Sequence, residues 1–176
     1  MTGATMNAVP PYDARAVANL FLDLAADRCL PLTQMSILKL IYFAHGWYLA
    51  TRDRPFISQD FEAWQYGPVV KAVRDEFKCF GERAVTARAQ RCDLLSGEWI
   101  EVKPLLAADD ATFVQRVFEA YHVYDAWQLS ALTHEKDSPW DRLWNASEPV
   151  GRMALRLRNG DIKEHFERLA TRLRSA

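Results

Sequence analysis

The sequence predicts a mainly α-helical fold: a single compact helical domain of about six to seven helices with a small two-stranded β ribbon. Apolar residues recur at helical spacing over most of the chain, capping residues precede several of these stretches, and strand-like alternation is confined to two short segments. With 176 residues, 49% of them hydrophobic, the chain can bury a core without disulfides. We expect residues 1–11 to form a flexible leader and residues 12–176 to form the domain.

The first helix is predicted to begin near Tyr12, with Asp13 as its cap, and to end at the segment Cys29–Pro31. Its apolar residues repeat at intervals of three and four: Val17, Leu20, Phe21 and Leu24.

Residues 33–50 contain the longest apolar segment and predict a second helix. Its apolar side chains cover almost every side, which is typical of a central, buried helix. We expect it to expose little beyond Thr33, Gln34, Ser36 and Lys39.

Two short segments have strand character, residues 61–66 and residues 97–102, and we expect them to pair as the ribbon. Between them, Gly67 and Pro68 predict a turn, with Pro68 as the first residue of a helix that runs through Phe80 and stops at Gly81.

Four further helices are predicted after the second strand. Asp109 or Asp110 is the expected cap of a helix ending near Tyr121, Asp125 caps the next, and Ser138 followed by proline caps a short third one. The last helix covers about residues 161–174.

The charge balance favours no particular class of partner, because the formal net charge is -1. Residues 150–176 hold seven Lys or Arg against three acidic residues, which makes a basic C-terminal helix. This excess is read either as a solvated helix face or as a docking surface.

Three cysteines without a C-x-x-C pair favour a reducing cytoplasm over a disulfide framework or a zinc site. The chain shows no secretory signal and no apolar run long enough for a membrane span, so no membrane association is expected.

No motif for catalysis, metal binding or cofactor binding stands out, and we predict that the protein is not an enzyme. The four histidines lack metal-ligand spacing, and glycine-rich phosphate loops are missing. His134 and Ser138 also suggest a hydrolase, but catalytic triads are usually assembled from distant segments and these two residues are close in sequence.

Aromatic residues are frequent outside the regular core pattern. Trp64 and Tyr66 flank the Gly-Pro dipeptide, and Trp127, Trp140 and Trp144 follow in a short stretch. Trp and Tyr dominate binding hot spots, but they also fill cores, and the sequence leaves both readings open.

Three ordered blocks are similar to the signature of the Panacea domain: LTQMSILKLIYFAHGWYLA, FEAWQYGPVVKAVRDEFKCFG and YDAWQLSALTHEKDSPW. The resemblance extends over about Tyr12 to Arg168. It departs at Ser36, where the family more often has lysine, and residues 82–105 match nothing in the pattern.

The resemblance implies a mostly helical antitoxin that binds a cognate toxin protein directly, or an adaptor that delivers the toxin to the ClpXP protease. It carries over no catalytic residue, no metal ligand and no cofactor, and it leaves homo-oligomer formation open. We expect the toxin to bind at Trp64, Tyr66, Gly67, Pro68, His134 and Trp140. We expect a protease to dock at Arg168, Arg172 and Arg174.

The alternative function is a DNA-binding regulator of the helix-turn-helix type, suggested by the two opening helices. A recognition helix needs exposed polar residues that reach base edges, and the segment 33–50 is too apolar for that. Nucleic acid is therefore not the expected partner.

Overall fold

The computed structural model describes residues 9–148 and 155–175, which form a mainly helical fold with two small antiparallel sheets. The α-helices are α1 (Ala14–Ala26), α2 (Gln34–Arg52), α3 (Lys71–Phe77), α4 (Ala108–Tyr121), α5 (Ala126–Thr133), α6 (Pro139–Ala146) and α7 (Asn159–Ser175), and a 3-10 turn, η1, covers Lys78–Phe80. The strands are β1 (Phe61–Trp64), β2 (Gly67–Val69), β3 (Gln90–Cys92), β4 (Trp99–Glu101) and β5 (Arg156–Leu157). Residues 1–8, most of the expected leader, lie outside the described residues.

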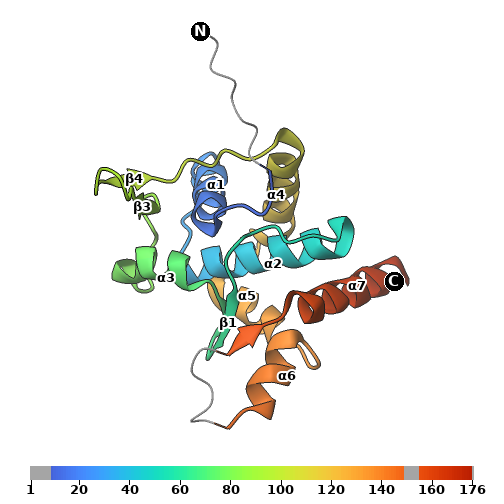
Figure 1. The fold of residues 1–176 in the computed structure, drawn as a ribbon. Helices are drawn as coiled ribbons and strands as arrows, with labels where there is room; N and C mark the ends of the chain where they lie inside the picture. The colour runs from blue at the N-terminus through green and yellow to red at the C-terminus, as the bar shows by residue number, and fades with distance from the viewer. Residues whose placement is uncertain (1–8, 149–154, 176) are drawn as a thin grey trace.

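Helix α2 is the centre of the fold (Figure 1). It packs against α1 and α4 on one side and against α5 and α7 on the other. Thirteen of its residues are buried, including Lys39 and Ser36. The prediction of a central helix is therefore confirmed, but the expected exposure of these two polar residues is wrong, because neighbours cover α2 on both sides.

Local capping signals place several helix ends correctly. As predicted, Asp13 caps α1, Asp125 forms a capping box at α5, and Ser138 caps α6. Thr33, the first residue of the predicted segment 33–50, caps α2. The cap predicted for α4 is wrong: Ala107 holds that position, and Asp109 and Asp110 lie inside the first turn.

Asp110 has another task. The residue is 3% exposed, and its carboxylate accepts hydrogen bonds from the hydroxyls of Tyr12 (2.7 Å) and Tyr48 (2.9 Å). These two bonds join α4 to α2 and to the chain before α1.

The strand pairing differs from the prediction. Strand β1 pairs with β2 and β5 in the order β2-β1-β5, whereas β4 pairs with β3 in a separate ribbon. The segment 61–66 therefore does not pair with residues 97–102. A helix starting at Pro68 is also wrong, since Pro68 lies in β2 opposite Ala63 and α3 begins at Lys71. Strand β2 is at the sheet edge, where a residue without an N–H is tolerated.

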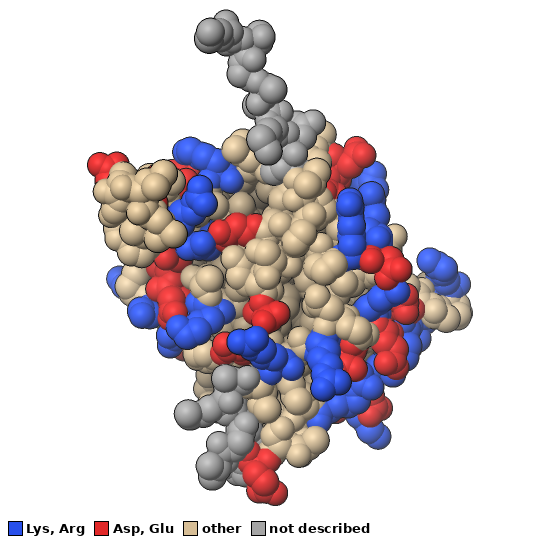
Figure 2. All heavy atoms as spheres, viewed as in Figure 1, with Lys and Arg blue, Asp and Glu red and all other residues tan. Residues whose placement is uncertain are grey.

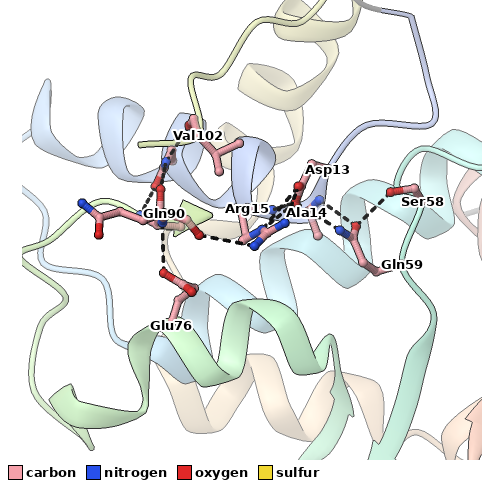
Figure 3. Close-up of polar contacts among 10 residues, drawn as sticks. Asp13, Ala14, Arg15, Ser58, Gln59, Glu76, Gln90 and Val102 are labelled. Atoms are coloured by element: carbon pink, nitrogen blue, oxygen red, sulfur yellow. Dashed lines mark hydrogen bonds and ion pairs between the residues drawn. The ribbon is translucent and has the colours of Figure 1, made fainter. Parts of the chain in front are cut away.

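Polar side chains attach the β3–β4 ribbon to the helical body (Figure 3). Arg15 of α1 donates to the carbonyl of Gln90, and the Gln90 N–H donates to the Glu76 carboxylate of α3. The buried side chain of Asn19 bonds the backbone of both Ala89 and Val102. The ribbon thus has a fixed base.

Candidate functional site: a clamped hairpin beside an aromatic groove

The β1–β2 hairpin is held by side chains from three helices. Trp140 Nε1 of α6 donates to the Trp64 carbonyl at 2.7 Å, and Ser130 Oγ of α5 donates to the Tyr66 carbonyl at 2.9 Å. Lys39 Nζ of α2 donates to the Pro68 carbonyl at 3.0 Å. The three sequence blocks therefore meet at one place, and alternate carbonyls of the hairpin are each bound by a different helix.

Gly67 makes this close approach feasible. Its φ of +100° is a conformation that side chains with a Cβ rarely adopt. A Cβ at this position would overlap Thr133 Oγ1 and lie 3.0 Å from Lys39 Nζ. Glycine is required here for packing as well as for backbone conformation.

His134, Ser138 and Trp140 lie together at the α5–α6 junction. The His134 and Trp140 rings have centroids 3.7 Å apart. Burial, followed by the nearby Lys39 charge, lowers the pKa of His134. Its Nε2 is buried and has no hydrogen-bond partner among the described residues.

Ser138 is used as a helix cap. Its Oγ donates to the Thr133 carbonyl at 2.9 Å and accepts from the Asp141 N–H at 3.1 Å. No hydrogen bond between Ser138 and His134 occurs within the described residues, so the geometry gives no support to a serine nucleophile activated by this histidine.

An open groove of about 710 Å³ lies beside the hairpin. Its wall residues come from the start of α2, the hairpin, α3, the segment after η1, and the start of α5; they are Thr33, Gln34, Met35, Leu38, Lys39, Trp64, Gln65, Tyr66, Val69, Arg74, Gly81, Glu82, Asp125, Ala126 and Trp127.

Two exposed aromatic side chains line this groove. Tyr66 is 49% and Trp127 58% exposed, and their rings meet edge to face with centroids 5.4 Å apart. Trp64 is half-buried next to them, with the Arg74 guanidinium 5.1 Å from its ring centroid. The pair is an exposed apolar surface on a well-fixed support.

The structure separates the six residues assigned to the toxin into two groups. Gly67, Pro68 and Trp140 are buried and hold the hairpin in place. Trp64, Tyr66 and His134 are partly or largely accessible, but His134 is not part of the groove wall. Trp127 is a groove residue that the sequence shows only as one of several aromatic residues, because its place opposite Tyr66 depends on tertiary contacts.

The three arginines assigned to a protease lie along the second half of α7 and are exposed. Arg168 pairs with Glu164 and donates to the Asp137 carbonyl, and Arg172 lies 3.5 Å from a Glu135 oxygen. Figure 2 shows basic and acidic side chains interspersed on this side of the molecule. Arg174 follows within the same last turns of the helix.

Helix α7 is also part of the core. Ile162 and Phe166 are buried against α2, and His45 Nε2 lies 2.9 Å from Asn159 Oδ1 at the start of α7. The basic helix is therefore not a detachable appendage.

A second exposed apolar surface lies on the β3–β4 ribbon. Leu94 and Leu95 at its tip are almost fully exposed, and Trp99 is 63% exposed. It belongs to the segment that does not match the Panacea pattern, and it offers a comparison surface for the groove.

Helix α2 lacks the exposed face that a DNA-recognition helix requires, because its residues from Ser36 to Gly46 are all buried. Within residues 9–148 and 155–175, no cluster of three or more potential metal ligands occurs. Over the same residues, no helix combines the length and apolar character needed to cross a membrane.

Comparison with known proteins agrees with the arrangement of the three blocks. Residues 37–141 match the family described as antitoxin SocA-like, Panacea domain. The chain is 38% identical over 154 residues to antitoxin SocA of Caulobacter vibrioides, a match that spans 88% of this chain and 82% of that protein. No solved structure matches. Because the family match and the identity both cover most of the chain, this protein belongs to the SocA-like Panacea-domain antitoxin family.

Proposed function

We propose that this protein is a cytoplasmic antitoxin that neutralises a cognate toxin by binding it directly, without catalysis, and that the toxin docks on the groove beside the hairpin. Membership of an antitoxin family supports the antitoxin role. The observation that carries the docking site is the exposed Tyr66–Trp127 pair on a hairpin held from three helices.

Rigid, exposed aromatic side chains are suited to protein binding. Tyr and Trp bury a large area while losing little conformational entropy, and they are enriched among residues whose truncation costs the most affinity. Because Tyr66 and Trp127 already contact each other, little ordering remains to be done when a partner binds.

The test is co-expression with the product of the neighbouring small open reading frame, comparing Trp127→Ala with Trp99→Ala. Both residues are exposed tryptophans, so neither change is expected to unfold the protein. Trp127→Ala is expected to weaken toxin binding by about 2 kcal/mol, roughly 30-fold, and to reduce protection, whereas Trp99→Ala leaves both unchanged.

Two results would overturn parts of this proposal. If the neighbouring product is neither toxic alone nor retained by this protein, the antitoxin role for this pair is lost. If Trp99→Ala abolishes binding and Trp127→Ala does not, the toxin docks on the β3–β4 ribbon.

Delivery of the toxin to the ClpXP protease is a further part of the proposal, with Arg168, Arg172 and Arg174 as the docking residues. Removal of α7 is not a suitable test because α7 covers α2. Arg172→Glu with Arg174→Glu changes only exposed side chains. These changes should leave toxin binding intact and stop toxin degradation; unchanged degradation would refute the assignment.

A further inference from the structure

Lys39 lies in the wall of the groove, but its side chain is only 1% exposed. A charged ammonium group has three N–H donors. Within the described residues, the only hydrogen bond of Lys39 Nζ goes to the Pro68 carbonyl, and Lys39 forms no ion pair with a carboxylate there. Burial lowers the pKa of Lys39 to about 7, since water is excluded and no negative charge compensates.

A buried lysine without a carboxylate is unusual, because an uncompensated buried charge is costly. The Pro68 carbonyl explains one donor. It does not explain the two further donors of a lysine whose neighbours in the groove wall include the apolar Leu38, Trp64 and Val69.

Two other features make the groove favourable for a negative group. The first turns of α2 and α5 both line it, through Thr33–Met35 and Ala126–Trp127, and the N-terminal end of a helix attracts anions. The Arg74 guanidinium also lies over the Trp64 ring, although it already pairs with Asp75 at 3.1 Å.

The carboxylates of the groove are already engaged or peripheral. Asp125 accepts the Gln128 N–H as the cap of α5, and Glu82 is exposed. The ionisable neighbour His134 lies at the end of α5, where the Lys39 charge helps to lower its pKa, and it brings no negative charge.

We propose that the groove binds an acidic side chain of the partner, Asp or Glu next to an apolar or aromatic residue, and that this carboxylate pairs with Lys39 Nζ while its neighbour packs on Tyr66 and Trp127. The inference rests on the proposed docking site and names the chemistry of the toxin segment that enters it.

Blocked tetrapeptides test the inference without the toxin. The first probe is acetyl-Gly-Trp-Glu-Gly-amide and the second replaces Glu with Gln, so that the two differ only in the side-chain charge. A third, with Gln and a free C-terminal carboxylate, separates a chain terminus from an acidic side chain. Binding is followed by NMR on the full-length protein through the Lys39 side chain and the Trp127 indole.

Near pH 6, where Lys39 is charged, the Glu peptide should bind roughly tenfold tighter than the Gln peptide. This preference should decrease toward about pH 9, and the pKa of Lys39 should rise when the Glu peptide is bound. Lys39→Met should remove the preference, whereas the matched change of an exposed lysine, Lys71→Met, should keep it.

Equal binding of the Glu and Gln peptides, no binding of either, or a preference that persists in Lys39→Met would overturn the inference. If the third peptide binds more tightly than the Glu peptide, the group that pairs with Lys39 is a C-terminal carboxylate and not an acidic side chain, and the inference is overturned. If Lys39→Met does not fold, the pKa of Lys39 in the wild-type protein still tests the pairing: it should rise when the Glu peptide is bound, and an unchanged pKa would overturn the inference. Since no toxin is involved, failure here leaves the antitoxin role standing, and loss of toxin binding does not affect the peptide result.

Discussion

The ring of Phe166 in α7 occupies the space next to Gly46 in α2 that a Cβ at residue 46 would need. The absence of a side chain at Gly46 lets the two helices approach closely. The same ring also meets Trp47 edge to face, with centroids 5.1 Å apart.

Gly46→Ala should therefore destabilise the protein by about 3 kcal/mol, because the added methyl group must displace a buried aromatic ring. Urea unfolding of the variant and the wild type measures this loss in the free energy of unfolding. Gly160→Ala is the matched control: Gly160 is in α7 with no atom near the position of a Cβ, and this change should stabilise by roughly 0.5 kcal/mol. A wild-type midpoint for Gly46→Ala would contradict the tight contact.

Tyr42→Phe should stabilise the protein by about 1 kcal/mol. The Tyr42 side chain is 1% exposed and its hydroxyl has no hydrogen-bond partner among the described residues, so removal of the oxygen removes a desolvation cost without breaking a bond. Thermal unfolding of the two proteins tests this. Destabilisation would show that the hydroxyl is satisfied by an internal water molecule.

Acid should destabilise the protein through His45. Burial lowers the pKa of His45 to about 4, and its Nδ1 accepts the Ile57 N–H at 3.3 Å. Because the unfolded chain has an ordinary histidine pKa near 6.5, it binds more protons between these values. Stability should therefore decrease as the pH falls from about 6.5 to 4, by on the order of 3 kcal/mol from this residue.

The contribution of His45 is measured as the difference between the wild type and His45→Gln, followed by urea unfolding over that pH range. Glutamine keeps a donor for Asn159 but does not titrate, so the variant should show a smaller pH dependence. Parallel curves for the two proteins would contradict the buried neutral state of His45.

Lys39 should act in a different pH range. Its folded pKa of about 7 lies below the ordinary value of 10.5, so the unfolded chain binds more protons and stability should rise with pH between these two values. Lys39→Met, which leaves the Pro68 carbonyl unpaired, should still be more stable than the wild type by on the order of 2 kcal/mol near pH 6. The advantage should shrink toward about pH 10, and an advantage independent of pH would contradict burial of the charge.

Local sequence signals predict the helices, but they predict few of the tertiary contacts. The caps Asp13, Asp125 and Ser138 could be identified because a capping side chain bonds its own helix within a few residues. The pairing of β1 with β5 could not be predicted, since β5 follows far along the chain and has only two residues.

The site was predicted only in part for the same reason. The sequence shows that Trp64, Tyr66 and Trp140 lie in signature segments. It does not show which of these three side chains is buried and holds the hairpin in place. Lys39 was expected to be exposed because a lysine on an apolar helix usually reaches water, whereas here α5 and the hairpin enclose it. Its role depends on contacts between segments that are distant in sequence.

The bond between His45 and Asn159 spans 114 residues. During translation at about 5–20 residues per second, α2 must wait on the order of ten seconds for α7 to be made. Over that interval the emerging chain presents the apolar side of α2 that α7 covers to chaperones and proteases. A message cut short before α7 would therefore yield a polypeptide that is cleared rather than a weaker form of the protein, and the supply of working molecules would depend on complete synthesis.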